Sequence, residues 1–131
     1  MIGLDTNVLV RYIMQDDPNQ SPHSAKLIES LSVDAPGFVP LVVVVELVWV
    51  LSAAYNMKRA QIDQVLDTLL RTKELIVDRA EQVLKAQRAF NSSSADFADC
   101  LIERIAASAG CAKTMTFDVG AAKAAGMTLI Q

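Results

Sequence analysis

The stretch MIGLDTNVLV, residues 1–10, contains the features from which the fold of this chain can be predicted. Its first four residues form a short apolar run, which predicts a strand over residues 1–4. The carboxylate of Asp5 follows, and apolar side chains then recur on one side of a predicted helix, Thr6–Met14. A strand that leads directly into a helix is the first part of a strand–helix–strand unit, and such units build parallel sheets.

The same alternation continues along the rest of the chain. Ser21 as N-cap and Pro22 at the first helical position predict a second helix that ends near Leu31. Further strands are expected at 38–39, 75–77, 114–117 and 127–130, and further helices at 58–72, 80–90, 95–109 and 121–125. Strands that alternate with helices indicate the α/β class, with a parallel sheet covered by helices and joined by right-handed crossovers.

The segment LVVVVELVWV, residues 41–50, permits two interpretations. Its many β-branched residues favour a strand, whereas its length and its continuation to Tyr55 favour a helix. Glu46 lies in the middle of this apolar segment. A carboxylate that is buried without a partner costs several kcal/mol or becomes neutral, so Glu46 is expected to have a cation nearby. The alternative is that Glu46 lies on the exposed stripe of an apolar helix.

Length and composition limit the classes of function. The 131 residues are 52% hydrophobic, which is enough for the core of one domain. Twelve Lys and Arg residues and fifteen Asp and Glu residues give a net charge of −3. Proteins that bind nucleic acids through charge alone are usually basic, so a polyanion would need a local basic patch, metal ions or the charge of a partner.

The sequence also gives expectations about location. The longest apolar stretch, residues 39–51, is shorter than the roughly 20 residues of a membrane span, and no leader segment is expected at the N-terminus. Cys100 and Cys111 form no CxxC pair. Both are expected to be buried thiols in a reducing cytoplasm, without contact to a membrane.

Four aspartates occupy positions that are typical of a ligand site. Asp5 follows the first strand and Asp118 follows the strand at 114–117, and ligands bind at the carboxyl ends of strands in α/β sheets. Asp96 and Asp99 start one helix and share a face. Each of the four also has a structural alternative, as an N-cap or as a first-turn acid that the helix dipole stabilises. Acids that converge at one sheet edge require hard cations, Mg²⁺ or Mn²⁺.

The ordered motifs LDTN (4–7), VVVVELVWVL (42–51), ADFADCLI (95–102) and TFD (116–118) resemble the PIN domain family, most closely the bacterial VapC-type toxins of toxin–antitoxin pairs. The resemblance covers essentially the whole chain. It implies one three-layer α/β/α domain over residues 1–131, with a central parallel sheet, and a helix rather than a strand at 41–55. It also implies an endoribonuclease that leaves a 5′-phosphate and a 3′-hydroxyl.

The resemblance implies a site as well as a fold. It assigns a Mg²⁺ or Mn²⁺ site, and with it the catalytic role, to Asp5, Glu46, Asp99 and Asp118. Asp96 is then an accessory metal ligand, and Thr6 and Asn7 orient the site. The implied partners are RNA, a small antitoxin-like protein, and a second copy of the chain. The implied dimer contact lies near Trp49, Val50 and Met57.

Other residues bear on the mechanism. His23 is the only histidine and is expected at the surface, so ribonuclease chemistry with a histidine pair is not available. Four basic residues either position phosphates or form a solvated helix face: Lys58, Arg59, Arg71 and Lys73. Two other functions compete with the nuclease. One is a phosphotransferase with Asp5 as nucleophile, which usually needs a second Asp where this chain has Asn7. The other is an inactive interaction module.

Overall fold

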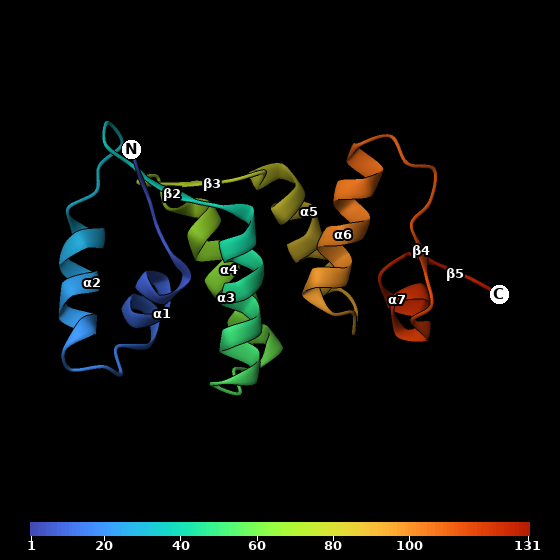
Figure 1. Cartoon of the computed structure of the whole chain (residues 1–131), viewed down its shortest axis with the longest axis horizontal. Helices are drawn as coiled ribbons and strands as arrows, with labels where there is room; N and C mark the ends of the chain where they lie inside the picture. Colours follow the sequence, from blue (N-terminus) through green and yellow to red (C-terminus); the bar gives the residue numbers. More distant parts are fainter. The chain divides into compact units, whose positions relative to one another are not determined.

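The computed structural model describes residues 1–131, and Figure 1 labels its helices and strands. The chain divides into two compact units. The N-terminal unit consists of Met1–Lys58 and Thr68–Asp78, and the C-terminal unit consists of Arg59–Asp67 and Arg79–Gln131. Helix α4 (Arg59–Arg71) contributes residues to both units. The α/β class with parallel strands is confirmed, and the strands form two sheets, one of three strands and one of two.

The N-terminal unit is built on the three-stranded sheet, in the order β1-β2-β3 with both pairs parallel. Helix α1 contacts both of the other helices that belong wholly to this unit, α2 and α3. The bounds of these elements are β1 (Ile2–Gly3), α1 (Thr6–Met14), α2 (Gln20–Glu29), β2 (Gly37–Val39), α3 (Leu41–Ala53) and β3 (Leu75–Val77). The parallel arrangement brings the carboxyl ends of all three strands to one edge, where Asp5 and Asp78 follow β1 and β3.

The apolar segment at residues 41–50, for which the sequence permitted a strand or a helix, lies within helix α3. Its buried side chains are Val43, Val44, Leu47 and Leu51, a spacing that places them on one helical face. Burying an aliphatic side chain contributes about 1.5–3 kcal/mol, and this gain exceeds the few tenths of a kcal/mol by which a β-branched residue disfavours a helix. The helix at this position, which the family resemblance implied, is therefore confirmed.

The N-terminus of α3 depends on a residue that the sequence analysis did not single out. Pro40 occupies the N-cap position and supplies no side-chain hydrogen bond. Instead, the Leu41 amide donates a hydrogen bond to Oδ2 of Asp78 at 3.1 Å. The Asp78 amide in turn donates to the Val39 carbonyl at 2.9 Å, which extends the ladder between β2 and β3. Asp78 therefore ties the end of one strand to the start of the helix that carries Glu46.

We expect Asp78→Ala to lower the free energy of unfolding by about 1 kcal/mol, the usual contribution of a helix cap. Asp78→Asn is the matched control, because asparagine caps helices about as well as aspartate. Urea unfolding of the three proteins measures the difference. Equal midpoints for Asp78→Ala and the unsubstituted protein would show that the contact with Leu41 does not contribute to stability.

The prediction that Ser21 caps α2 is wrong. The helix begins at Gln20, and Asn19 at the N-cap makes no side-chain hydrogen bond. Asp17 has that role, because its Oδ1 accepts hydrogen bonds from the amides of Gln20 at 2.8 Å and Asn19 at 2.9 Å. These two bonds, the one from Gln20 first, lower the pKa of Asp17. The Ser21 hydroxyl accepts from the Asp17 amide at 3.3 Å and so closes the turn.

The C-terminal unit pairs α5 with α6, and it joins a two-stranded parallel sheet to α7. The rings of Phe90 and Phe97 meet edge to face, with their centroids 6.0 Å apart. Gly110 follows α6 with φ of +94°, a conformation that favours glycine, and this agrees with the predicted helix end. The bounds of these elements are α5 (Ala80–Asn91), α6 (Phe97–Ser108), β4 (Met115–Thr116), α7 (Val119–Ala124) and β5 (Thr128–Leu129).

None of the helices has the length and apolar character required to cross a membrane. Cys100 is buried in α6 as predicted, but Cys111 is exposed, so the prediction for Cys111 is wrong. Cys111 lies directly after Gly110, outside the helix, where no element covers it.

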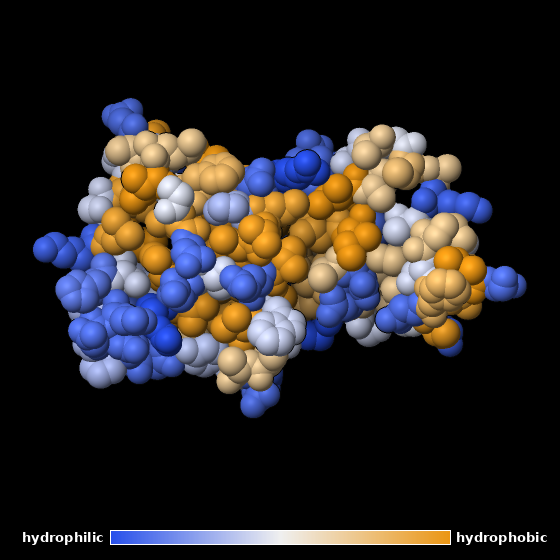
Figure 2. All heavy atoms as spheres, in the orientation of Figure 1, coloured by the Kyte–Doolittle hydropathy of each residue, from blue (hydrophilic) through white to orange (hydrophobic).

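Helix α3 leaves Val42 and Trp49 exposed, at 72% and 67%, and Figure 2 shows apolar side chains at the surface over this helix.

Candidate active site

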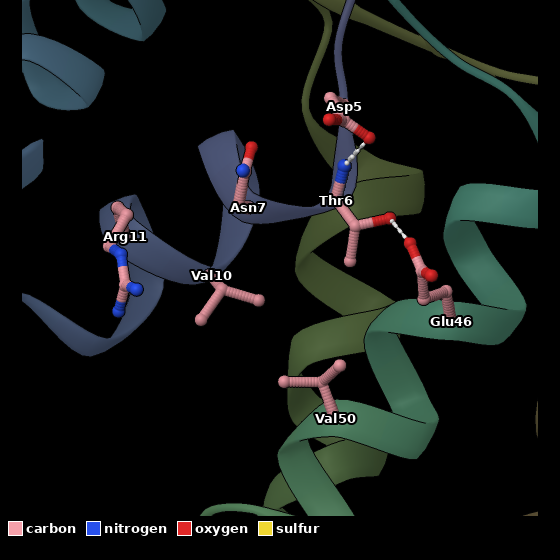
Figure 3. Close-up of a pocket in the computed structure, with 7 residues that line it drawn as sticks. All are labelled: Asp5, Thr6, Asn7, Val10, Arg11, Glu46 and Val50. Carbon is pink, nitrogen blue, oxygen red and sulfur yellow. Dashed lines mark hydrogen bonds between the residues drawn. The ribbon is translucent and has the colours of Figure 1, made fainter.

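Two separate stretches of the N-terminal unit line one hollow of about 240 Å³ (Figure 3). The N-cap and first turn of α1 contribute Asp5, Thr6 and Asn7 of the LDTN motif, and the middle of α3 contributes Glu46. We call this the Asp5 hollow. Its lining residues are Asp5, Thr6, Asn7, Val10, Arg11, Glu46 and Val50.

Thr6 connects the two motifs at this hollow. Its hydroxyl donates a hydrogen bond to Oε1 of Glu46, and its amide donates to Oδ1 of Asp5 at 2.8 Å. Thr6 is buried, so its rotamer is held by packing as well as by these bonds. One small residue therefore fixes the positions of two carboxylates that lie 41 positions apart in the chain. This contact is what an orienting role for Thr6 requires.

Glu46 is exposed, and the prediction that it is buried is wrong. The face of α3 that packs inward carries Val43, Val44 and Leu47, and the side chain of Glu46 lies outside that face. The apolar neighbours in the sequence therefore do not desolvate this carboxylate, and its burial gives no argument for a cation. The argument that remains is its position in the Asp5 hollow beside Thr6.

The other three acids lie in the C-terminal unit. Asp96 is the N-cap of α6, where its Oδ1 accepts from the Asp99 amide at 3.2 Å. Asp118 is the N-cap of α7 and accepts from the Ala121 amide at 3.0 Å. Burial raises the pKa of Asp99, and the negative charges of Asp96 and Asp118 raise it further. The three carboxylates are therefore close enough to interact.

The structural alternatives are thus correct for all four aspartates, since Asp99 is an acid in the first turn of α6. Asp5, Asp96 and Asp118 each cap a helix, and each cap uses Oδ1. The second carboxylate oxygen of each residue takes no part in its cap. The positive end of a helix also stabilises a negative charge at its N-terminus. Capping and ligand binding are therefore compatible at these positions.

The acidic side chains are of the type that binds a hard cation, but the structure brings too few of them together in one place to hold one. Carboxylate oxygens suit Mg²⁺ and Mn²⁺, and each unit supplies at least two of them. However, no group of three or more His, Cys, Asp or Glu side chains is arranged in the structure to hold a metal ion. Asp5 and Glu46 belong to the N-terminal unit, and the other three acids belong to the C-terminal unit.

Arg59 has a structural role in the C-terminal unit. Its guanidinium lies 3.8 Å from the centroid of the Phe90 ring. Nη2 also donates hydrogen bonds to the carbonyls of Phe90 at 2.8 Å and Ser93 at 3.1 Å. These contacts hold the start of α4 against the end of α5. Contact of Arg59 or Lys58 with RNA stays a prediction.

Arg11 is a residue of this site that the sequence analysis missed. It is the only basic residue that lines the Asp5 hollow. A signal was present in the sequence, because Asn7 and Arg11 lie four residues apart on a predicted helix and therefore share a face. Its position gives the hollow one positive side chain opposite two carboxylates.

A comparison with protein families matches the PIN domain over residues 2–127. The chain belongs to the PIN domain family. Among curated proteins, none matches the chain. The PIN domain is a nuclease-type fold, and PIN domains are generally hydrolases that use a divalent metal. Membership therefore supports a nuclease-type fold and an RNA ligand for this PIN domain protein.

Proposed function

We propose that this PIN domain protein is a Mg²⁺- or Mn²⁺-dependent endoribonuclease, the toxin of a type II toxin–antitoxin system. The observation that supports it most is the contact between Thr6 and Glu46, which joins two of the four family motifs around one hollow. The proposal treats residues 1–131 as one nuclease domain. The proposal also has the protein act on RNA in the cytoplasm.

In this proposal Asp5, Glu46, Asp99 and Asp118 together hold the cation, with Asp96 as an accessory ligand. Burial and, after it, the negative charges of Asp96 and Asp118 raise the pKa of Asp99, which supports the proposal because a bound cation would favour the ionised carboxylate. When bound, such an ion neutralises phosphate charge and lowers the pKa of water. Thr6 holds Glu46 in place, and Asn7 lines the same hollow as Asp5 and Glu46.

The proposal is tested by incubating the purified protein with single-stranded RNA in Mn²⁺ or Mg²⁺. We expect internal cleavage that leaves a 5′-phosphate and a 3′-hydroxyl. We expect cleavage to stop in excess EDTA, because the proposed ligands are all oxygen donors, which bind Mg²⁺ or Mn²⁺, and EDTA removes these ions. Full cleavage in EDTA would rule out metal dependence. RNA binding without cleavage would favour the inactive module, and a burst of phosphate from small phosphoesters would favour the phosphotransferase.

We further propose that the protein forms a homodimer through the exposed face of α3 around Trp49 and that a small antitoxin-like protein inhibits it. Val42 and Trp49 support the dimer, because large exposed apolar side chains on one helix are typical of an interface. Light scattering is expected to give twice the mass of one chain. Trp49→Lys is expected to return the mass to that of a monomer, and a monomeric unsubstituted protein would contradict the proposal.

A further inference from the structure

A second hollow adjoins the Asp5 hollow in the N-terminal unit. Its volume is about 230 Å³, and its lining residues are Asn7, Val8, Arg11, Gln20, His23 and Ser24. Asn7 and Arg11, four residues apart on α1, line both hollows, so the two cavities share this turn of the helix. We call this second cavity the His23 hollow, since the only histidine of the chain lines it.

Arg11 is held in place between the two hollows. Its Nε donates to Oε1 of Gln20 at 2.9 Å, and its Nη1 donates to the Tyr55 hydroxyl at 3.4 Å. Nη1 also lies 3.5 Å from Oδ1 of Asp16, which neutralises part of its charge. These three contacts use Nε and Nη1, so Nη2 remains for a further acceptor. A planar guanidinium held on one side is well suited to bind a phosphate oxygen on the other.

The rest of the lining suits a nucleobase rather than a simple anion. The amides of Asn7 and Gln20 and the Ser24 hydroxyl are neutral donors and acceptors, which match the edges of bases. The His23 ring is exposed and gives a flat surface for stacking. No carboxylate lines this hollow, in contrast to its neighbour.

We propose that the His23 hollow binds one unpaired nucleotide of the RNA, next to the phosphate that is cleaved, with Arg11 on the connecting phosphate. This inference rests on the proposed function. Each hollow is smaller than the roughly 300 Å³ at which pockets begin to enclose a whole drug-sized ligand, so each fits one part of a dinucleotide step. The base must leave any helix to enter, and the bound RNA is therefore single-stranded.

Nuclear magnetic resonance provides a direct test, because the imidazole signals of the unsubstituted protein come from His23 alone. An unstructured RNA tetranucleotide is added in EDTA, where the proposed cleavage does not occur. We expect a saturable change in the His23 signals that inorganic phosphate does not reproduce. Arg11→Gln should weaken binding about tenfold, the effect of one hydrogen bond to a charged group. Lys26→Gln, which removes a charge from α2 without altering the lining, should not.

Kinetics in Mn²⁺ separate this inference from the proposed function. His23→Ala is expected to raise KM for RNA several-fold and to leave kcat nearly unchanged, since His23 lies outside the hollow that contains the carboxylates. If RNA is cleaved but His23 signals do not move and KM is unchanged, the second hollow is not an RNA site and the nuclease proposal stands. If RNA is not cleaved at all, the signals of His23 alone decide whether the hollow binds it.

Discussion

Asp99→Asn is expected to lower the rate of RNA cleavage by more than about a hundredfold, the scale for loss of a ligand of a catalytic metal. Asp99 is half-buried, and its pKa is raised by that burial and by the charges of Asp96 and Asp118. A carboxylate in this environment needs a cation more than a solvated one does. Cleavage rates and metal titrations of the variant measure the effect.

Asp96→Asn is the matched comparison. Asp96 is exposed, and asparagine can still accept the hydrogen bond from the Asp99 amide that caps α6. We therefore expect a smaller loss of activity, with a stability change of about 1 kcal/mol or below. The opposite ranking of the two variants would place the third acid of the site one helical turn earlier than proposed.

Stability distinguishes loss of a ligand from damage to the fold. Because the pKa of Asp99 is raised in the folded state, the folded protein binds the proton of this carboxyl more tightly than the unfolded chain does. The resulting contribution to stability is fully present below the ordinary pKa of 3.8 and is lost as the pH rises through the raised pKa. In metal-free protein at neutral pH, Asp99→Asn should therefore be more stable than the unsubstituted chain, and the difference should disappear in acid. Urea midpoints at the two pH values measure it.

Glu46→Gln is expected to weaken metal binding and to reduce cleavage by a similar factor, more than about a hundredfold. The fold should be unchanged, because Glu46 is exposed and the Oε1 of glutamine can still accept the Thr6 hydrogen bond. Glu81→Gln is the control, since it removes an exposed carboxylate that lines neither hollow. Calorimetric titration with Mn²⁺ and cleavage assays measure both effects.

Thr6→Val tests how much the orientation of Glu46 matters. Valine keeps the shape of the buried side chain but removes the hydroxyl that contacts Glu46. A partner that orients a metal ligand usually contributes about 10–100-fold in affinity, so this variant should be affected less than Glu46→Gln. For the Glu46→Gln variant described above, a cleavage rate equal to that of the unsubstituted protein would mean that the Glu46 carboxylate is only a surface group.

Local signals predicted the elements of this fold better than they predicted burial. The strand at Leu75–Val77 and the helix Thr6–Met14 have the bounds that the sequence indicates, because each has a clear apolar pattern and a clear end. The expected burial of Glu46 rests on its apolar neighbours in the sequence, and that of Cys111 rests on the general tendency of free cysteines to be buried. Whether a side chain is buried depends on which face its element turns inward, and a single sequence does not give that directly.

The residues of the candidate site likewise divide into those that a local sequence pattern predicts and those that only the tertiary structure reveals. The strand-end argument that selected Asp5 and Asp118 applies equally to Asp78, which follows β3 and caps α3 from another part of the chain. Its partner, Leu41, is 37 residues away in the sequence, so the pairing becomes evident only in the structure. The same holds for His23 and Asn7, which line one hollow from two helices.

The exposure of Trp49 also gives the protein an intrinsic optical reporter. It is the only tryptophan of the chain, so all indole fluorescence arises from one position on α3. In a single chain Trp49 is 67% exposed, so the emission of the monomer is expected to be that of an indole in water and open to collisional quenchers such as acrylamide. Any molecule that covers this helix moves the emission to shorter wavelengths and protects it from quenching, without a label and without a change in sequence.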